Sequence, residues 1–292
     1  MHINLSDIKS GFSDRLRAVT YFIALNKLLK SKNIYFITQK KTRECNFKFQ
    51  DYCYIKNSKL IKYNRFKKKE INLNSYNSSI NLKNCINNNI YRKIDSKKLF
   101  VEWKKSYAKI FPKKKIIKLI KKINLPKKYS SIHLRTTDKV IKLNNFIKNI
   151  HVSDNIFDFQ LNYYTKNLIK IIKKYTDGKN IFIASDDFKL KTKIINLLKK
   201  NGYNTHYHHS KFNSKNLRQT SGKDFVVDLF CIAKSNLVVS TVGAGVIQSA
   251  YYLSKEKLKV IILNNQFNIM VFFRLLIILI YYLKRLKSIF FK

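Results

Sequence analysis

The segment 131–139, Ser-Ile-His-Leu-Arg-Thr-Thr-Asp-Lys, carries side chains that can bind an anion. It continues an apolar run that predicts a buried strand. Alternation along a strand places His133 and Arg135 on one face, with Arg135 at the strand's end, where a guanidinium can hold a phosphate through two parallel hydrogen bonds. Arginine occupies only nine positions in the chain, so an arginine at the end of a core strand favours a function. A buried salt bridge from Arg135 to Asp138 or Asp228 is the alternative.

A turn with two glycines, Thr241-Val-Gly243-Ala244-Gly245, follows another expected strand and begins the next expected helix. Backbone N–H groups and the helix dipole make such a position favourable for an anion. In a parallel sheet it is also the carboxyl edge, where ligands bind. The sequence therefore predicts a phosphate near this turn, although Gly-x-Gly turns after strands are common in other settings.

Two carboxylates, Asp186 and Asp187, end a further expected strand on the same edge. They could accept hydrogen bonds from a ribose or a base. The alternative is that they cap the helix that follows. Both interpretations stay open from the sequence.

The second half of the chain alternates near-continuous apolar strands with amphipathic helices. The expected strands cover residues 129–134, 180–185, 203–208, 237–241 and 258–263, and the expected helices cover residues 156–175, 189–200, 224–234 and 246–253. This alternation is typical of a parallel sheet with helices on both faces.

The first third opens with a short apolar stretch and predicts a βαβ unit. The expected elements are a helix over 16–29, a strand over 33–38 and helices over 97–111 and 113–123, the last delimited by Pro112 and Pro126. With 292 residues, the chain is long enough for two domains. We expect an N-terminal α/β domain over 1–111, a second α/β domain over 112–266, and a C-terminal segment over 267–292.

Sixty Lys and Arg residues against 16 Asp and Glu give a formal net charge of +44. Such an excess ordinarily points to nucleic acid or an anionic membrane. However, 51 of the 60 are Lys, spread through a chain rich in Ile and Asn, which is typical of AT-rich codon bias. A solvated lysine-rich surface is the preferred interpretation, and a polyanion-binding patch is the alternative. With 45% hydrophobic and 14% aromatic residues, the chain is too apolar to be disordered.

Three features of the sequence indicate the cellular compartment of the protein: its cysteines, its N-terminus and its C-terminal segment. Four cysteines without a CxxC pair predict a reducing compartment and no structural zinc. Residues 1–13 lack the apolar region of a signal peptide. The segment 267–292 predicts a basic, apolar helix whose longest apolar run, 275–283, is shorter than the roughly 20 residues that span a bilayer. Such a helix lies in a membrane interface or packs on the fold. We expect a cytoplasmic protein, with peripheral contact at the inner membrane face as the alternative.

In their order along the chain, these motifs resemble the GDP-fucose-dependent fucosyltransferase superfamily. The resemblance is to alpha-1,6-fucosyltransferases, including the nodulation enzymes, and more distantly to protein O-fucosyltransferases. It rests on His-x-Arg-x-Thr-Asp-Lys at 133–139, on the strand that ends in Ser-Asp-Asp at 185–187, and on the helix and strand over 228–241. Gly-Phe-Ser-Asp-Arg-Leu-Arg at 11–17 is similar to the N-terminal Gly-x-x-(Asn/Asp)-Arg-Leu-Arg loop of bacterial relatives.

The resemblance implies a GT-B fold, with two Rossmann-like domains that face a cleft. It implies a GDP-sugar donor, a glycan or lipid-linked oligosaccharide acceptor, no metal cofactor and no specific nucleic acid. Arg135 would stabilise the leaving GDP by binding its diphosphate. The implied donor-binding residues are Gly11, Arg17, His133, Arg135, Asp186, Asp187, Asp228, Thr241, Gly243, Ala244 and Gly245.

The general base is unassigned, because the chain departs from the family pattern at two positions. Thr136 stands where the alpha-1,6 enzymes have a second arginine, and the acidic residue that they place shortly after Asp-Lys is absent. Asp138, His151 and Asp154 are the candidates. The sequence favours an inverting fucosyltransferase-like enzyme; a lysine-rich polyanion-binding protein and a catalytically degenerate sugar-nucleotide-binding relative are the alternatives.

Overall fold

The structure is a computed structural model. It describes residues 2–4, 11–30, 34–39, 41, 45, 47–60, 94–135, 168–176, 178–209, 221–240 and 245–262. Within these ranges, no helix has both the length and the hydropathy needed to cross a bilayer.

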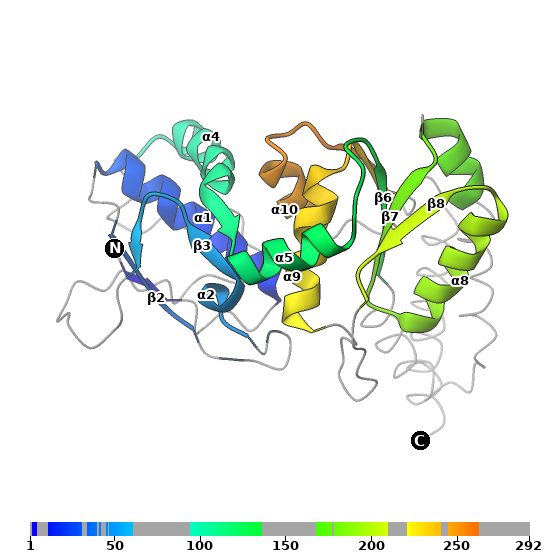
Figure 1. Ribbon diagram of the computed structural model, residues 1–292. Helices are drawn as coiled ribbons and strands as arrows, with labels where there is room; N and C mark the ends of the chain where they lie inside the picture. Colours follow the sequence, from blue (N-terminus) through cyan, green and yellow to red (C-terminus); the bar gives the residue numbers. More distant parts are fainter. Residues whose placement is uncertain are drawn as a thin grey trace, which may run out of the picture.

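A five-stranded, wholly parallel sheet organises the second half of the chain (Figure 1). Its strands are β6 (Ser130–Leu134), β7 (Asn180–Ser185), β8 (Asn204–Tyr207), β9 (Leu237–Ser240) and β10 (Lys259–Ile262). Their spatial order is β10-β9-β6-β7-β8. Strands β7 and β8 therefore lie on one side of β6, and β9 and β10 lie on the other side. This is the Rossmann order, and it leaves a switch point between β6 and β9, where ligands of such sheets bind.

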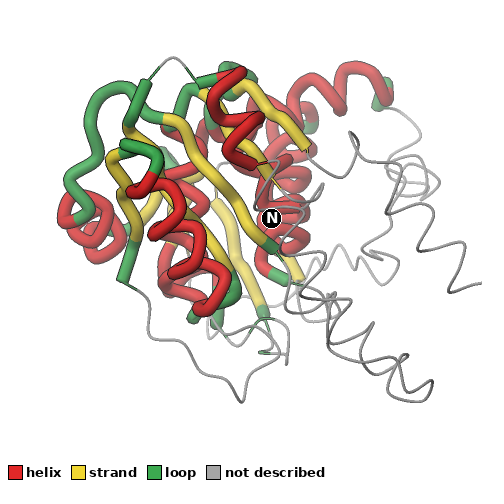
Figure 2. Tube along the Cα trace, turned by 90° about the vertical axis from the view of Figure 1, so that its right-hand side faces the viewer, coloured by secondary structure: helices red, strands yellow, loops and turns green. Residues whose placement is uncertain are grey.

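Helices cover both faces of this sheet, and Figure 2, seen from the α8 side, shows helices in front of and behind the strands. They are α8 (Phe188–Lys200), α9 (Gly222–Lys234), α10 (Gly245–Leu253) and the helical residues 168–175, and α5 (Lys114–Lys122) packs against α9. Alternate residues of β7 enter different cores: Ile181 and Ile183 pack with α8, whereas Phe182 and Ala184 pack with α9 and α10. The predicted parallel sheet is therefore confirmed.

The N-terminal part holds a smaller parallel sheet. Its elements are β1 (His2–Asn4), α1 (Phe12–Leu28), β2 (Ile34–Thr38), α2 (Phe49–Tyr52), β3 (Cys53–Ile55) and β4 (Lys59–Leu60), followed by α4 (Ser96–Ser106), the 3-10 turn η2 (Tyr107–Lys109) and β5 (Ile110–Pro112). The sheet order is β1-β2-β4, and β1 pairs with β2 in parallel, which confirms the βαβ opening.

The helix predicted over 97–111 was wrong at its end. Helix α4 stops at Ser106, and Ile110 and Phe111 belong to β5, which pairs antiparallel with β3. This pairing with β3 gives the physical reason, and Pro112 contributes because a proline favours extended backbone in the residue before it, Phe111. The helix predicted over 113–123 is confirmed as α5.

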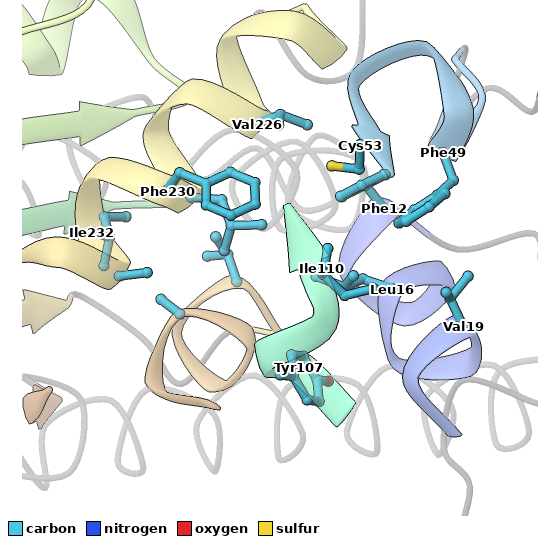
Figure 3. Packing of buried hydrophobic residues seen from close by; sticks show 14 of the residues in the cluster. Phe12, Leu16, Val19, Phe49, Cys53, Tyr107, Ile110, Val226, Phe230 and Ile232 are labelled. Atoms are coloured by element: carbon cyan, nitrogen blue, oxygen red, sulfur yellow. The ribbon is translucent and has the colours of Figure 1, made fainter. Parts of the chain in front are cut away.

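Helix α1 joins the two parts of the fold. It packs against α4 on one side and α10 on another. Phe12, Leu16 and Val19 of α1 share one apolar core with Val226 and Phe230 of α9, as Figure 3 shows. The first turns of α1 and α10 also lie close together, because a Cβ added to Gly245 would lie 3.0 Å from Ser13. The domain boundaries at 111 and 266 stay predictions.

We expect Gly222→Ala to destabilise the protein by about 1–3 kcal/mol, the usual cost of overpacking a core. Gly222 begins α9, and a methyl group added there would overlap the ring of Phe47. That ring cannot easily move, because it stacks on Phe12 with ring centroids 5.1 Å apart and also packs on Tyr52. Urea unfolding measures the effect. Gly178→Ala is the matched control, since a methyl group at Gly178 meets no atom within 4 Å; equal stability of the two variants would contradict the packing argument.

Candidate functional site

Four of the residues predicted from the sequence meet in a small cavity at the carboxyl edge of the large sheet, at the ends of β6 and β7. The cavity has a volume of about 50 Å³, and it is lined by His133, Arg135, Ala184, Ser185, Asp186, Phe225, Asp228 and Val246. Arg135 directly follows β6, and Asp186 directly follows β7. Because Ile132 and Leu134 face the α8 side, His133 faces α9 and α10.

His133 is a neutral polar group in this cavity. It is buried, and its Nδ1 lies 3.0 Å from the hydroxyl oxygen of Ser240 on the adjacent β9. Burial, with a smaller contribution from the charge of Arg135, lowers the pKa of His133 to about 3. A neutral imidazole carries one N–H donor and one acceptor nitrogen. His133 can therefore hydrogen-bond a ligand without adding a second positive charge beside Arg135.

Asp228 is the acceptor of the cavity. Its side chain is buried, and its Oδ1 accepts no hydrogen bond among the described residues. Burial raises the pKa of Asp228 to about 7; the nearby Lys191 and His208 act against this rise, and the charge of Asp224 adds to it. A buried carboxylate oxygen without a donor is unfavourable. This position thus favours a ligand that brings N–H or O–H groups.

A buried polar network beneath Asp228 fixes the start of α9, and sequence analysis did not identify it. His208 Nε2 lies 2.7 Å from Asp224 Oδ1, Ser221 donates to Asp224 Oδ2 at 2.7 Å, and Lys191 donates to the carbonyl of His208 at 2.8 Å. Burial alone would raise the pKa of Asp224, but the hydrogen bonds from His208 and Ser221 leave it below its ordinary value. The Ser-x-x-Asp spacing at 221–224 is a capping signal that could have located this helix start.

Asp187 uses its carboxylate as a helix cap. Its side chain accepts a hydrogen bond from the backbone N–H of Leu190 at 2.9 Å in the first turn of α8. The neighbouring Asp186 lines the cavity instead, and its backbone N–H donates to the carbonyl of Leu134 at 3.3 Å. The capping alternative therefore describes Asp187, whose predicted contact with the donor stays a prediction.

A second, larger pocket lies on the other side of the first turn of α10. It has a volume of about 490 Å³ and is lined by Arg17, Gly245, Ile247, Gln248, Tyr251, Val260 and Ile262. Val246, between Gly245 and Ile247, lines the first cavity, so the start of α10 separates the two spaces. The structure thus brings Arg17 of α1 to the edge of the predicted donor site.

Arg17 is fixed in this pocket by two partners. Its guanidinium donates to the side-chain oxygen of Gln248 at 2.8 Å and lies 3.3 Å from Asp14. A Cβ added to Gly245 would lie 3.0 Å from Ser13, so a side chain there would press α1 and α10 apart. Gly11 precedes α1, where its carbonyl accepts from the backbone N–H of Asp14 at 3.2 Å, and it lines neither pocket.

Several predicted positions lie outside the described residues. They are Asp138, His151, Asp154, Thr241, Gly243, Ala244 and the segment 267–292. The choice of a general base therefore stays a prediction. In the part of the chain that the structure describes, no three His, Cys, Asp or Glu side chains are grouped to hold a metal ion; the absence of a metal cofactor also stays a prediction.

Two solved structures with a similar fold are NodZ fucosyltransferases. One is NodZ alpha-1,6-fucosyltransferase soaked with GDP-fucose, with 12% sequence identity and a TM-score of 0.54 over 86% of this chain and 91% of that chain. NodZ from Bradyrhizobium has 12% identity and a TM-score of 0.51 over 85% of this chain and 91% of that chain. POFUT1 in complex with GDP matches a smaller part, 55% of this chain and 51% of that chain, with 13% identity and a TM-score of 0.36.

No protein-family description and no curated protein sequence matches the chain. At this identity, the similarity to NodZ shows a shared fold. It agrees with the resemblance found in the motifs, and the mixed α/β architecture with its parallel sheet is confirmed. The two-domain cleft and the C-terminal helix stay predictions.

Proposed function

We propose that this protein is a glycosyltransferase that moves fucose from GDP-fucose to a hydroxyl group of a glycan. The observation that carries the proposal is the convergence of His133, Arg135, Asp186 and Asp228 in one cavity at the carboxyl edge of the parallel sheet. The fold shared with NodZ, an alpha-1,6-fucosyltransferase whose crystal was soaked with GDP-fucose, supports the choice of donor.

At about 50 Å³ the cavity can hold only part of a nucleoside diphosphate, and it offers that part a cation and hydrogen-bond acceptors. Arg135 provides a charge-assisted contact for the diphosphate, and the N-terminal turn of α10 directs backbone N–H groups toward the same edge. Asp228 accepts from N–H or O–H groups of the base or ribose, and neutral His133 hydrogen-bonds beside it. Arg135 and Asp228 would contact different groups of the donor, and this would give the bound donor a defined orientation.

In the transfer itself, the acceptor hydroxyl oxygen attacks the anomeric carbon of the sugar. The bond from that carbon to the β-phosphate oxygen breaks, GDP leaves with the electron pair, and a base takes the acceptor proton. Arg135 would stabilise the negative charge that grows on the leaving diphosphate, which is the electrostatic contribution that such sites supply. A single displacement of this kind inverts the configuration at the anomeric carbon. The base would be Asp138, His151 or Asp154.

The acceptor would be a glycan of cell-surface or lipid-linked oligosaccharide synthesis. We place the enzyme in the cytoplasm, with contact to the inner face of the membrane. The 490 Å³ pocket beside Arg17 offers room for an acceptor sugar next to the donor cavity. Tyr251 on its wall provides an aromatic surface on which a sugar ring can pack.

A ligand panel tests the donor. We expect GDP to raise the melting temperature, UDP and ADP to raise it less, and the GDP shift to persist at high salt. A short oligonucleotide should lose any effect at high salt, because its binding would depend on counterion release. Stabilisation by every polyanion, abolished by salt in each case, would contradict the proposal in favour of a lysine-rich binding surface.

A product assay tests the reaction. Purified protein supplied with GDP-fucose and a panel of glycans should release GDP in step with fucosylated product. Specific GDP binding without product from any acceptor would instead identify a sugar-nucleotide-binding protein that has lost catalysis.

A further inference from the structure

Helix α4 lies over α1 on the outside of the fold (Figure 1). Its inner face buries Leu99 and Trp103, both almost fully. On the outward face, Phe100 is 41% exposed and Val101 is 46% exposed. Phe100 and Val101 are thus adjacent large apolar side chains on one helix face, and both can contact a partner there.

Lysines surround this pair, and the helix has almost no acidic residue to balance them. We call Lys97, Lys98, Phe100, Val101, Lys104 and Lys105 the α4 face. Glu102, the only acidic residue within α4, turns toward α1 and pairs with Lys27 at 2.6 Å, with Lys105 3.6 Å away. Among the described residues, no acid pairs with Lys97 or Lys98. The face therefore combines a net positive charge with an apolar centre.

A cavity of about 380 Å³ adjoins this face. Its lining residues are Val101, Lys104, Lys105, Ala108, Tyr252, Lys255 and Glu256. Val101, Ala108 and Tyr252 form apolar walls, whereas three lysines supply positive charge. Glu256 offsets part of that charge, since it lies 2.9 Å from Lys104. A cavity with apolar walls and lysines at its rim suits an amphiphile with an anionic head.

We propose that the α4 face docks on an anionic phospholipid bilayer, with Phe100 and Val101 inserted at the boundary of head groups and acyl chains. The lysines lie at the level of the anionic head groups, and the adjoining cavity receives one head-group phosphate. Basic residues that flank exposed apolar side chains on one helix face are the arrangement by which helices bind membrane interfaces. The proposal does not depend on the donor site.

The same residues argue against nucleic acid as the partner. All basic residues of the α4 face are lysine, whereas arginine is the residue that grips phosphate bidentately. Val101, at the centre of the face, gives a base no flat surface for stacking, and Lys104 lies over the ring of Phe100, 5.0 Å from its centroid. A bilayer uses both components of the face, because it supplies negative charge and an apolar interior at once.

Sedimentation with vesicles tests the proposal on the full chain. We expect tight binding to phosphatidylcholine vesicles that contain phosphatidylglycerol and weak binding to phosphatidylcholine alone. The double substitution Phe100→Ser and Val101→Ser should weaken binding to the mixed vesicles by about tenfold or more. Replacing Lys97 and Lys98 with Gln should weaken it by about 25-fold, at about fivefold for each lysine near an anionic surface.

Helix α5 provides the matched controls, since it is similarly basic and exposes Ile117 to 38%. Ile117→Ser, and Lys118→Gln with Lys121→Gln, should leave vesicle binding within about twofold of the unchanged protein. Equal losses from α4 and α5 variants would overturn the proposal, as diffuse charge would then explain binding. So would the absence of vesicle binding, or preference for an oligonucleotide over the vesicles. Unchanged melting temperature and GDP binding in each variant would show that the fold and the donor site are intact.

Discussion

Replacing Arg135 with alanine is expected to weaken GDP binding about ten- to a hundredfold. Arg135 lines the cavity at the end of β6, beside neutral His133, and a charge-assisted hydrogen bond of this kind contributes about 1.5–3 kcal/mol. The loss in fucose transfer should be larger than the loss in binding, because charge grows on the diphosphate as GDP leaves. Isothermal titration at high salt measures the first effect, and initial rates with saturating donor measure the second.

Two control variants distinguish a specific contact of Arg135 with the diphosphate from a general effect of positive charge. Arg135→Lys keeps the positive charge but loses the planar fork, so it should recover only part of the binding. Lys118→Ala removes one positive charge from an exposed position on α5 and should leave GDP binding unchanged. If Arg135→Ala bound and turned over the donor normally, the assignment of the diphosphate to this cavity would be wrong.

The large sheet could be predicted because its signals are local. The strands of a covered parallel sheet are apolar on both faces, and β7 appears in the structure with the predicted bounds, Asn180–Ser185. The error at the end of α4 has a different origin. Helical periodicity continues through Ile110 and Phe111, but pairing with β3, far away in sequence, turns these residues into a strand.

Part of the site could also be predicted from the positions at which the parallel strands end. Residues that follow parallel strands must meet at one edge, so Arg135 and Asp186 could be placed together without knowing the loops between them. The network of Lys191, His208 and Asp224 was missed because its members come from three separate elements, and no local pattern relates them.

The Gly11–Arg17 motif shows a further limit of sequence reasoning. Its two arginines look equivalent in the sequence, but helix geometry sends Arg15 and Arg17 in different directions. Arg15 is fully buried, and burial lowers the pKa of its guanidinium. Arg17 instead reaches the pocket beside α10. Only the packing of α1 between α4 and α10 distinguishes a core arginine from one at a binding pocket.

Asp228 should make the protein less stable as the pH rises, and Asp228→Asn should remove that dependence. The pKa of Asp228 is raised from 3.8 to about 7 in the folded state, mainly by burial. Between these values the folded protein holds a proton that the unfolded chain has lost, so stability is fully present below pH 3.8 and falls until the pH passes about 7. At 1.36 kcal/mol for each pH unit, the loss is about 4 kcal/mol.

Urea unfolding of both proteins across this pH range isolates the effect, because other titrating groups cancel in the difference between them. The Asn variant should be the more stable protein above pH 7. Asp224→Asn should behave in the opposite sense, since the pKa of Asp224 is lowered and its contribution is lost as the pH falls. A constant difference between unchanged protein and Asp228→Asn would show that Asp228 does not carry this proton.

The same proton links Asp228 to the donor. If N–H or O–H groups of GDP bind its Oδ1, they favour the ionised carboxylate, so GDP binding should tighten as the pH rises through 7 and should release a proton. Titration calorimetry in two buffers with different ionisation enthalpies measures that release. The release should vanish in Asp228→Asn and persist in Lys118→Ala. The negative charge of Asp228 destabilises the folded protein when the cavity is empty, and a bound nucleotide would stabilise the same charge. Folding and donor binding would therefore both depend on the ionisation of Asp228.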